Sequence, residues 1–367
     1  MRRRRVIVLC HEDLVPPARL EGLSRREIDA FRTEWDVASG LRRAGHDVRF
    51  VGVSDDLEPI RRSVRSWRPH AVFNLLMEFR NEGAHQARIA AYLELLGVPA
   101  TGPDARGIAV TRDKALAKQI LLHHGLPTPA FAVHPRRGPA EDDRSLRFPR
   151  IVKSREEEAS LGIAQASLVH DRARMRERVA FVHRRVGTDA IVEEYVDGRE
   201  LTVGVIGNAR PTAFPVWELS FARLPPRSAA IATTRAKFDD AYRRRVGVRS
   251  GRARGLSPET DSGIRRLATR AYRVLGLSGY ARMDLRLPAG GPAQIIEVNA
   301  TPDVARREDF AASARAAGIP YPRLLERILA LALARSGGRG TPLAGGPRLR
   351  EPLPACRCRS SSRCASP

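Results

Sequence analysis

Two acidic residues and an asparagine stand at strand-like spacing near the carboxyl end of the chain. Glu297 and Asn299 alternate with apolar residues in IIEVNA, and Asp284 does the same in YARMDLRL. Side chains on a strand alternate between its two faces, so Glu297 and Asn299 point one way. Ile296 and Val298 are expected to point the other way. If the two runs pair through the turn PAGGP, three oxygen-bearing side chains converge, and such oxygens are the ligands that Mg²⁺ takes in nucleotide sites.

An ordinary amphipathic hairpin is the alternative, with Asp284 and Glu297 simply facing solvent. The turn NATPD follows directly after the acidic position of the second run. Loops at strand ends commonly carry function, so this placement favours a cation site over a solvent-exposed hairpin.

Lysine is scarce in this chain. Lysine and arginine together number 64, and only four of these are lysines: Lys114, Lys118, Lys153 and Lys237. The ammonium group of lysine is a compact charge on a flexible stem that reaches phosphate oxygens, and the broad fork of arginine does not replace it in a crowded phosphate site. Lysines kept in an arginine-rich chain therefore indicate contacts with phosphate.

Residues 6–100 supply a scaffold, because apolar runs and amphipathic segments alternate along them. The runs VIVLC, DVRFVGV and HAVFNLL are predicted strands. The predicted helices are 24–45, 57–67 and 83–96. This βαβαβα order implies a parallel sheet with helices on its faces, and functional side chains are expected where the strands end.

Predicted strands and helices alternate less regularly in the second half of the chain. TRDKALAKQILLHHG reads as a helix, and the loop at 135–147 is rich in charge and proline, which favours a hinge there. Further helices are expected at 171–185 and after Ser257, with strands at RIVKS, AIVEEYV and RELTVGVIG and an irregular region at 225–255. Two helices are predicted to close the body of the protein.

These elements divide the chain into three predicted domains and a tail. The predicted boundaries are 1–105 for an N-terminal βαβ domain, 106–205 for a central lid domain and 206–335 for a C-terminal domain with the cation site. Residues 336–367 hold too few apolar side chains to pack and are predicted to be disordered.

The composition limits the partners of this protein. The apolar run in MRRRRVIVLC is too short for a secretory signal, and no window reaches the ~18 apolar residues of a membrane span. A cytoplasmic protein without membrane contact is therefore expected. The net charge of +23 admits nucleic acid as a partner, but aromatic residues make up only 5% and the arginines are spread over every predicted helix, which disfavours it.

The sequence resembles the ATP-grasp carboxylate–amine ligases, and among them the D-alanine–D-alanine ligases, over roughly residues 6–335. The family pattern R-x-D followed by E-x-N-x-x-P is matched by Arg282, Asp284, Glu297 and Asn299. The resemblance implies an α/β, three-domain ATP-grasp fold, in which an N-terminal parallel-sheet domain precedes two α+β domains that enclose ATP. It also implies a homodimer.

The resemblance assigns roles to the charged residues. Mg²⁺, with Mn²⁺ as an alternative, is expected on Asp284, Glu297 and Asn299. Lys114 in DK and Lys153 in VK correspond to the family's phosphate-binding lysines. The remaining expectations are an acyl-phosphate contact for Lys237, oxyanion stabilisation for Arg282 and, more weakly, orientation of the incoming ammonium for Glu12. Lys118 matches no family position and is expected to be an ordinary surface residue.

The adenosine of ATP is expected on the strand VEEYVDGRE, which lies between the lysine strand and the cation strands as the family order requires. The implied contacts are Glu193, Glu194, Tyr195 and Val196 for adenine and Glu200 for the ribose hydroxyls. Plain surface acids are the alternative interpretation of Glu193 and Glu194.

Several residues depart from the dipeptide-ligase pattern. Glu158 and Ala159 stand where the family's phosphate loop has glycine and serine, although Ser160, a predicted nucleotide contact, remains. Phe238 replaces a tyrosine, and Asp303 replaces a glycine beside the oxyanion. All of these positions border the amino-acid pocket, so we expect the substrates to differ.

The sequence therefore predicts an ATP- and Mg²⁺-dependent ligase that joins a carboxylate to an amine through an acyl phosphate, with amino acids or small peptides as substrates. One alternative is an ATP-grasp ligase for a substrate pair other than two D-alanines. The other is a non-enzymatic basic protein that binds polyanions, for which the net charge of +23 is the only support.

Overall fold

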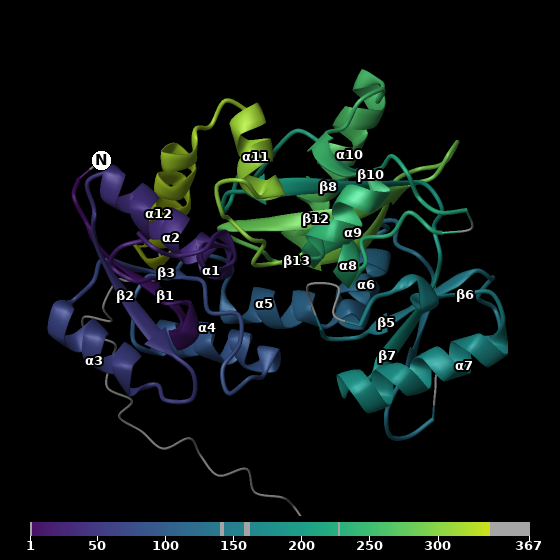
Figure 1. Ribbon diagram of the computed structural model, residues 1–367, viewed down its shortest axis with the longest axis horizontal. Helices are drawn as coiled ribbons and strands as arrows, with labels where there is room; N and C mark the ends of the chain where they lie inside the picture. Colours follow the sequence, from purple (N-terminus) through teal and green to yellow (C-terminus); the bar gives the residue numbers. More distant parts are fainter. Residues whose placement is uncertain (1, 140–142, 158–161, 227, 338–367) are drawn as a thin grey trace, which may run out of the picture.

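The N-terminal part of the protein is the parallel sheet predicted from the sequence. A computed structural model describes residues 2–139, 143–157, 162–226 and 228–337 (Figure 1), so the predicted tail lies outside the described residues from 338 onward. The first sheet has the order β2-β1-β3 with both strand pairs parallel. Its strands are β1 (Arg5–His11), β2 (Asp47–Val53) and β3 (Ala71–Asn74).

The helices around this sheet follow the predicted order, with one break. They are α1 (Arg25–Ala30), α2 (Arg32–Arg43), α3 (Glu58–Trp67) and α4 (Gln86–Leu95). Ser24 begins α1 with a capping box, in which its hydroxyl accepts from the amide of Glu27 while the Glu27 carboxylate accepts from the amide of Ser24. The segment predicted as one helix is divided at Phe31, where the backbone leaves the helical conformation.

A four-stranded antiparallel sheet forms the middle of the chain, in the order β4-β7-β5-β6. Two connecting helices lead to it, α5 (Ala105–Arg112) and α6 (Lys114–His123), and α7 (Arg172–Phe181) packs on it. The strands are β4 (Phe131–His134), β5 (Arg150–Ser154), β6 (Leu168–Val169) and β7 (Ala190–Glu194). Buried apolar residues such as Val152, Met175 and Val192 join the sheet to the helix.

The third sheet carries the predicted cation strands in the order β11-β10-β8-β12-β13, with β9 paired to β8. Its strands are β8 (Arg199–Ile206), β9 (Thr212–Ala213), β10 (Trp217–Phe221), β11 (Val248–Arg252), β12 (Tyr280–Leu287) and β13 (Gln294–Asn299). The accompanying helices are α8 (Thr234–Phe238), α9 (Asp240–Val246), α10 (Pro258–Val274), α11 (Asp309–Ala316) and α12 (Tyr321–Gly337).

The prediction of an irregular region at 225–255 is wrong. That region contains α8, α9 and β11, and β11 pairs with β10. Each element is short and rich in arginine, so it shows little apolar periodicity. Thr233 and Asp239 cap the two helices with their side chains, and these polar contacts stabilise elements that a hydrophobic pattern does not reveal.

The first and third sheets share one hydrophobic core. Val6 and Phe73 of the parallel sheet lie in the same cluster of buried residues as Tyr280 of β12, Phe310 of α11 and Leu325 of α12. In Figure 1, α12 lies beside α2 over the parallel sheet. The domain boundaries at 105, 205 and 335 stay predictions. Within the part of the chain described, no helix is long and apolar enough to cross a membrane.

A buried carboxyl at the junction of these sheets leads to a prediction about pH. Glu34 on α2 is 5% exposed, and burial together with the negative charge of Asp303 raises its pKa from 4.5 to about 7. The folded state therefore keeps a proton that the unfolded chain releases, so stability should fall as the pH rises from about 4.5 to 7. We expect Glu34→Gln to be more stable than the wild type at pH 8 by ~3 kcal/mol.

Urea denaturation at pH 5 and pH 8 checks this expectation. Glu34→Gln should lose less stability between the two values than the wild type does. Glu21→Gln is the control, because Glu21 is exposed. An unchanged pH dependence in Glu34→Gln would contradict the account.

Candidate active site

The predicted cation hairpin is present. β12 and β13 pair antiparallel, with Asp284 directly opposite Glu297 and Arg282 directly opposite Asn299. Directly opposite residues of an antiparallel pair share a face, so the four side chains emerge together. The side chains of Asp284 and Glu297 are 13% and 25% exposed, which excludes the solvent-facing hairpin as an interpretation.

One detail of the predicted alternation is wrong. The register of β12 and β13 shifts between Asp284 and Leu285, where Leu285 pairs with Ile295. The extra residue is Ile296, and it lines the same cavity as Glu297 instead of pointing to the opposite face. A β-bulge of this kind re-aims a side chain, and single-strand periodicity does not show it.

Each predicted metal carboxylate is held by a cation. The guanidinium of Arg282 donates to both oxygens of Asp284, at 2.6 and 2.8 Å. The Lys114 ammonium lies 3.3 Å from a Glu297 oxygen. Burial alone would raise the pKa of Glu297, but the positive charges of Lys114, Lys237 and Lys153 outweigh it and lower the pKa to about 2. Glu297 is therefore ionised throughout the physiological pH range.

A second charge cluster is fully buried behind the first. Glu193 has no exposed surface, and its Oε2 lies 3.0 Å from the Lys153 ammonium and 3.3 Å from the Lys118 ammonium. The alternative of a surface acid at Glu193 is therefore wrong. Lys118 also donates to the Thr128 hydroxyl at 2.8 Å, and that hydroxyl donates to the Ile295 carbonyl of β13 at 2.7 Å.

The prediction of Lys118 as a surface residue is also wrong. It is 3% exposed, and burial lowers its pKa to about 8. Lys118 lies four residues after Lys114 on α6, so the two side chains stand on one face of the helix. This spacing is the sequence signal that could have placed Lys118 in the site, and the prediction did not use it.

A narrow cavity between the second and third sheets gathers most of the predicted nucleotide residues. It is lined by the following charged and predicted residues: Lys153, Glu193, Glu194, Tyr195, Val196, Glu200, Lys237, Asp284, Arg286 and Glu297. Lys237 reaches this cavity from α8. The structure therefore brings residues from five separated segments to one place.

Arg286 is a member of the site that sequence reasoning missed. Its guanidinium donates to Glu200 Oε2 at 2.9 Å, and the Ala232 amide donates to the same oxygen at 3.2 Å. Burial raises the pKa of Glu200, and the charge of Arg286 opposes this rise. The signal was available, because Arg286 follows Asp284 by two residues and therefore shares its face of β12. At the edge of the cavity, Glu194 pairs instead with exposed Arg147 at 3.0 Å.

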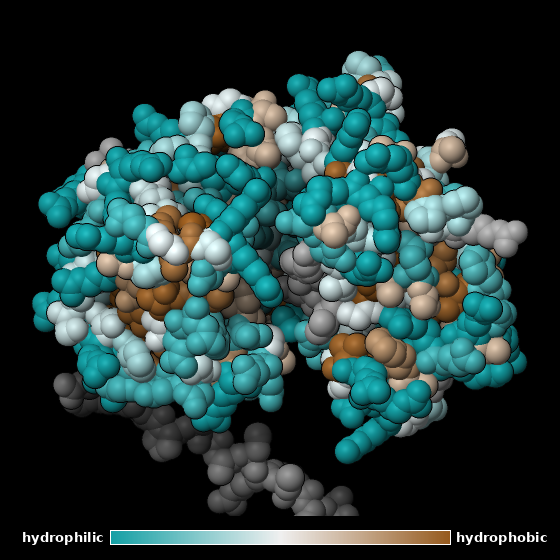
Figure 2. All heavy atoms as spheres, in the orientation of Figure 1, coloured by the Kyte–Doolittle hydropathy of each residue, from teal (hydrophilic) through white to brown (hydrophobic). Residues whose placement is uncertain are grey.

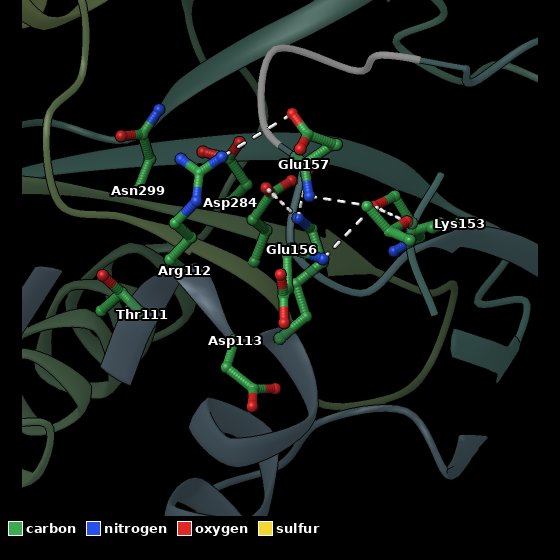
Figure 3. A network of polar contacts seen from close by, with 12 residues as sticks. Thr111, Arg112, Asp113, Lys153, Glu156, Glu157, Asp284 and Asn299 are labelled. Carbon is green, nitrogen blue, oxygen red and sulfur yellow. Dashed lines mark hydrogen bonds and ion pairs between the residues drawn. The ribbon is translucent and has the colours of Figure 1, made fainter. Parts of the chain in front are cut away.

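Arg112 compensates part of the negative charge of the acidic loop that follows β5. Its guanidinium lies 3.7 Å from the Glu157 carboxylate, and the Lys114 ammonium donates to the Glu157 carbonyl. Figure 3 shows Arg112 and Glu157 meeting in front of the strands that carry Asp284 and Asn299. Gly83 lies so close to this guanidinium that a Cβ there would collide with it. Arg112 therefore compensates part of the negative charge that Glu157 would place near a triphosphate in this site.

Some predicted residues are not part of this assembly. Ser160, with Glu158 and Ala159, lies outside the described residues, and so does the side chain of Phe238. Glu12 is exposed in a short 3-10 helix after β1, and no contact recorded for the described residues joins it to the cavity.

Asp303 occupies the junction with the N-terminal sheet. It accepts hydrogen bonds at 2.8 Å from the Thr33 hydroxyl of α2 and from the Ala305 amide. A glycine at this position would make no such side-chain contact. Across the described ranges, no three His, Cys, Asp or Glu side chains are grouped to hold a metal ion, so the predicted set depends on two carboxylates and the amide of Asn299.

Known proteins are similar to this chain in sequence and in architecture. The family model described as D-ala D-ala ligase C-terminus matches residues 120–330, which is more than half of the chain. A D-alanine–D-alanine ligase of Desulforudis audaxviator is 32% identical over 321 residues, which cover 86% of this chain and 97% of the relative. An uncharacterized protein of Sinorhizobium fredii is 32% identical over 269 residues, which cover 73% of this chain and 76% of the relative.

A solved structure shows the same fold. The crystal structure of a D-alanine–D-alanine ligase from Bacillus anthracis complexed with ATP aligns with a TM-score of 0.70 and 19% sequence identity, and covers 92% of this chain and 100% of that one. The ATP-grasp fold expected from the sequence is thereby confirmed. The chain belongs to the D-alanine–D-alanine ligase family, the ATP-dependent ligases of the ATP-grasp fold.

Proposed function

We propose that the protein uses ATP and Mg²⁺ to activate the carboxylate of an amino acid as an acyl phosphate and joins it to an amine, with two D-alanines as the first candidate pair. The observation that carries this proposal is the facing of Asp284 and Glu297 on β12 and β13, with Lys114, Lys153 and Lys237 around Glu297. A nucleotide triphosphate with a divalent cation needs this combination of acidic and cationic side chains.

The side chains fit a hard divalent cation. Asp284 and Glu297 offer carboxylate oxygens on one face, and the low pKa of Glu297, about 2, keeps that ligand ionised. Asn299 adds an amide oxygen beside them. When bound there, Mg²⁺ would neutralise charge on the phosphates, and oxygen ligands also admit Mn²⁺. Each carboxylate keeps free lone pairs beside its contact with Arg282 or Lys114, so these cationic side chains would lie next to the bound ion.

The cationic side chains of the site would contact the anionic groups of the substrates. Lys114 and Lys153 would hold the phosphates of ATP, and Lys237 would contact the acyl phosphate. Arg282 would stabilise the oxyanion that forms when the amine attacks. These side chains lower the barrier by positioning and by electrostatic stabilisation, because the substrate carboxylate itself forms the new bond to phosphorus.

An unpartnered atom supports the adenine site. Glu193 Oε1 is buried without a hydrogen-bond partner among the described residues. A buried acceptor without a donor is costly, and the amino group of adenine would supply one. Backbone groups of Glu194, Tyr195 and Val196 would complete the adenine contacts, and Glu200 would accept from the ribose hydroxyls.

Other expectations remain predictions. They are a role for Ser160 in the phosphate loop and for Glu12 in ammonium orientation, a homodimer, and a location in the cytoplasm. A second candidate function is ligation of a different amino-acid or peptide pair. The Asp303 contact with Thr33 favours it, because this side chain stands where the dipeptide ligases have glycine.

A screen for ADP release tests the proposal. D- and L-amino acids, D-lactate and short peptides would be supplied singly and in pairs with ATP and Mg²⁺, beside Asp284→Asn as the inactive control. We expect at least one pair to give ADP and phosphate in equal amounts only with the wild type. The non-enzymatic alternative predicts no ADP with any substrate and a nucleic-acid affinity that falls steeply with salt.

A further inference from the structure

A second cavity lies away from the residues assigned to ATP. It encloses about 610 Å³ between α1 of the N-terminal region and the β10, α9 and β11 segment. Within the described residues, its charged lining consists of one carboxylate and five guanidinium groups: Asp240, Arg25, Arg223, Arg243, Arg244 and Arg249. A volume of this order is typical of pockets for small ligands. In Figure 2 the surface around the hollow between α1 and α9 is predominantly hydrophilic.

The positive charge of this cavity is poorly compensated. Arg25 lies 3.7 Å from Asp29 on its own helix. The other four arginines have no carboxylate within ion-pair distance among the described residues, and Arg223 donates instead to the Arg244 carbonyl at 2.9 Å. Several like charges around one hollow repel each other, and an anion in the hollow would relieve that repulsion.

Arg243 joins this cavity to the candidate active site. Its guanidinium donates to the carbonyls of Ala236 and Lys237, at 2.8 and 3.1 Å. Those carbonyls belong to α8, and the Lys237 side chain lines the cavity that holds Asp284 and Glu297. A ligand that contacts Arg243 would therefore lie next to the helix that carries Lys237.

We propose that this arginine cavity binds a carboxylate or phosphate group carried by the amine substrate, so that the protein ligates an acidic amino acid or an acidic peptide. The planar fork of arginine binds both groups through paired hydrogen bonds, which gives orientation as well as attraction. The substrate class rests on the second candidate function above, ligation of a pair other than two D-alanines, whereas anion binding by the cavity does not.

Binding measurements distinguish a specific anion site in the arginine cavity from nonspecific attraction by the positive charge of the protein. Citrate and inorganic phosphate would be titrated calorimetrically into the whole protein at fixed salt, with Mg²⁺ and a non-hydrolysable ATP analogue present to fill the phosphate site. Arg244→Ala/Arg249→Ala should weaken probe binding at least tenfold. The matched control is Arg62→Ala/Arg65→Ala, which removes two exposed arginines from α3 and should leave affinity within twofold.

Three results would overturn the proposal. The first is that the wild type binds neither probe. The second is that Arg244→Ala/Arg249→Ala binds the probes as tightly as the wild type does. The third is that this variant and Arg62→Ala/Arg65→Ala lose affinity equally. A single-stranded oligonucleotide that displaces citrate at equimolar amounts would assign the cavity to nucleic acid instead of a small substrate.

Substrate pairs that differ only in charge test the substrate class. D-glutamate would be compared with D-glutamine, and O-phospho-D-serine with D-serine, as the amine in the ADP-release assay. The acidic member should be preferred, and Arg244→Ala/Arg249→Ala should raise its KM at least tenfold more than that of its neutral partner. Equal changes for both members would overturn the assignment. Absence of ADP with every pair would refute the proposed function, while the citrate titration would still decide whether the cavity binds anions.

Discussion

Asp284→Asn and Glu297→Gln are each expected to reduce ADP release at least ~10²-fold, and the double variant at least ~10³-fold. Both substitutions keep the size of the side chain and remove the charge that would hold the divalent cation. The two residues act on one cation, so their effects should not add independently. Steady-state ADP release at saturating ATP and Mg²⁺ is the measurement.

Glu218→Gln is the matched control for this prediction. Glu218 lies on β10 of the same sheet, and its carboxylate pairs with Arg199 at 2.7 Å, outside the cavity. It should retain activity within about twofold of the wild type, because its carboxylate does not line the cavity that holds Asp284 and Glu297. If Asp284→Asn and Glu297→Gln behaved like Glu218→Gln, the cation site would be assigned to the wrong residues.

Glu193→Gln is expected to lower the free energy of unfolding by ~3–5 kcal/mol. Glu193 is fully buried and compensates the charges of Lys118 and Lys153. Their charges lower its pKa against the opposing effect of burial, so the carboxylate is ionised at neutral pH. Its removal would leave the buried ammonium groups of Lys118 and Lys153 without their ion-pair partner, which costs far more than the loss of a hydrogen bond.

Glu194→Gln provides the comparison at the neighbouring position. Glu194 pairs with Arg147, whose side chain is 86% exposed, so solvent screens the pair and the expected cost is ~0–1 kcal/mol. Urea denaturation at pH 7 measures both variants. Equal destabilisation by the two substitutions would show that the buried charges are not compensated as described.

The sequence carried enough information for the regular elements and for the pairing of the cation strands. β1 to β3 are recognisable because each is an apolar run bounded by helical segments. Period-two alternation, together with pairing through the turn PAGGP, predicts that Asp284 and Glu297 share a face, and the structure shows them directly opposite each other. The bulge at Ile296 was not predictable, since it depends on the register between two strands. The helices α8 and α9 were missed because polar caps define them.

Buried charge was the hardest feature to predict. Lys118 and Arg286 are 3% exposed each, yet their types are normally found at the surface. They are buried because Glu193 and Glu200, which come from other strands, neutralise them. Such pairs join segments far apart in the chain, so local patterns identify the candidates but not the partners. Two sequence signals were available for these residues. Lysine is scarce in the chain, and Lys118 and Arg286 are spaced so that they share a face with Lys114 and Asp284, respectively.

Transfer of oxygen-18 tests the central claim most directly. The amino acid identified in the ADP-release screen would be labelled with oxygen-18 in its carboxylate and turned over with ATP and Mg²⁺. Attack of the carboxylate on the γ-phosphate places one labelled oxygen between carbon and phosphorus, and release by the amine leaves that oxygen in phosphate. We predict one oxygen-18 per phosphate, measured by mass spectrometry. Unlabelled phosphate accompanying product formation would contradict activation through an acyl phosphate.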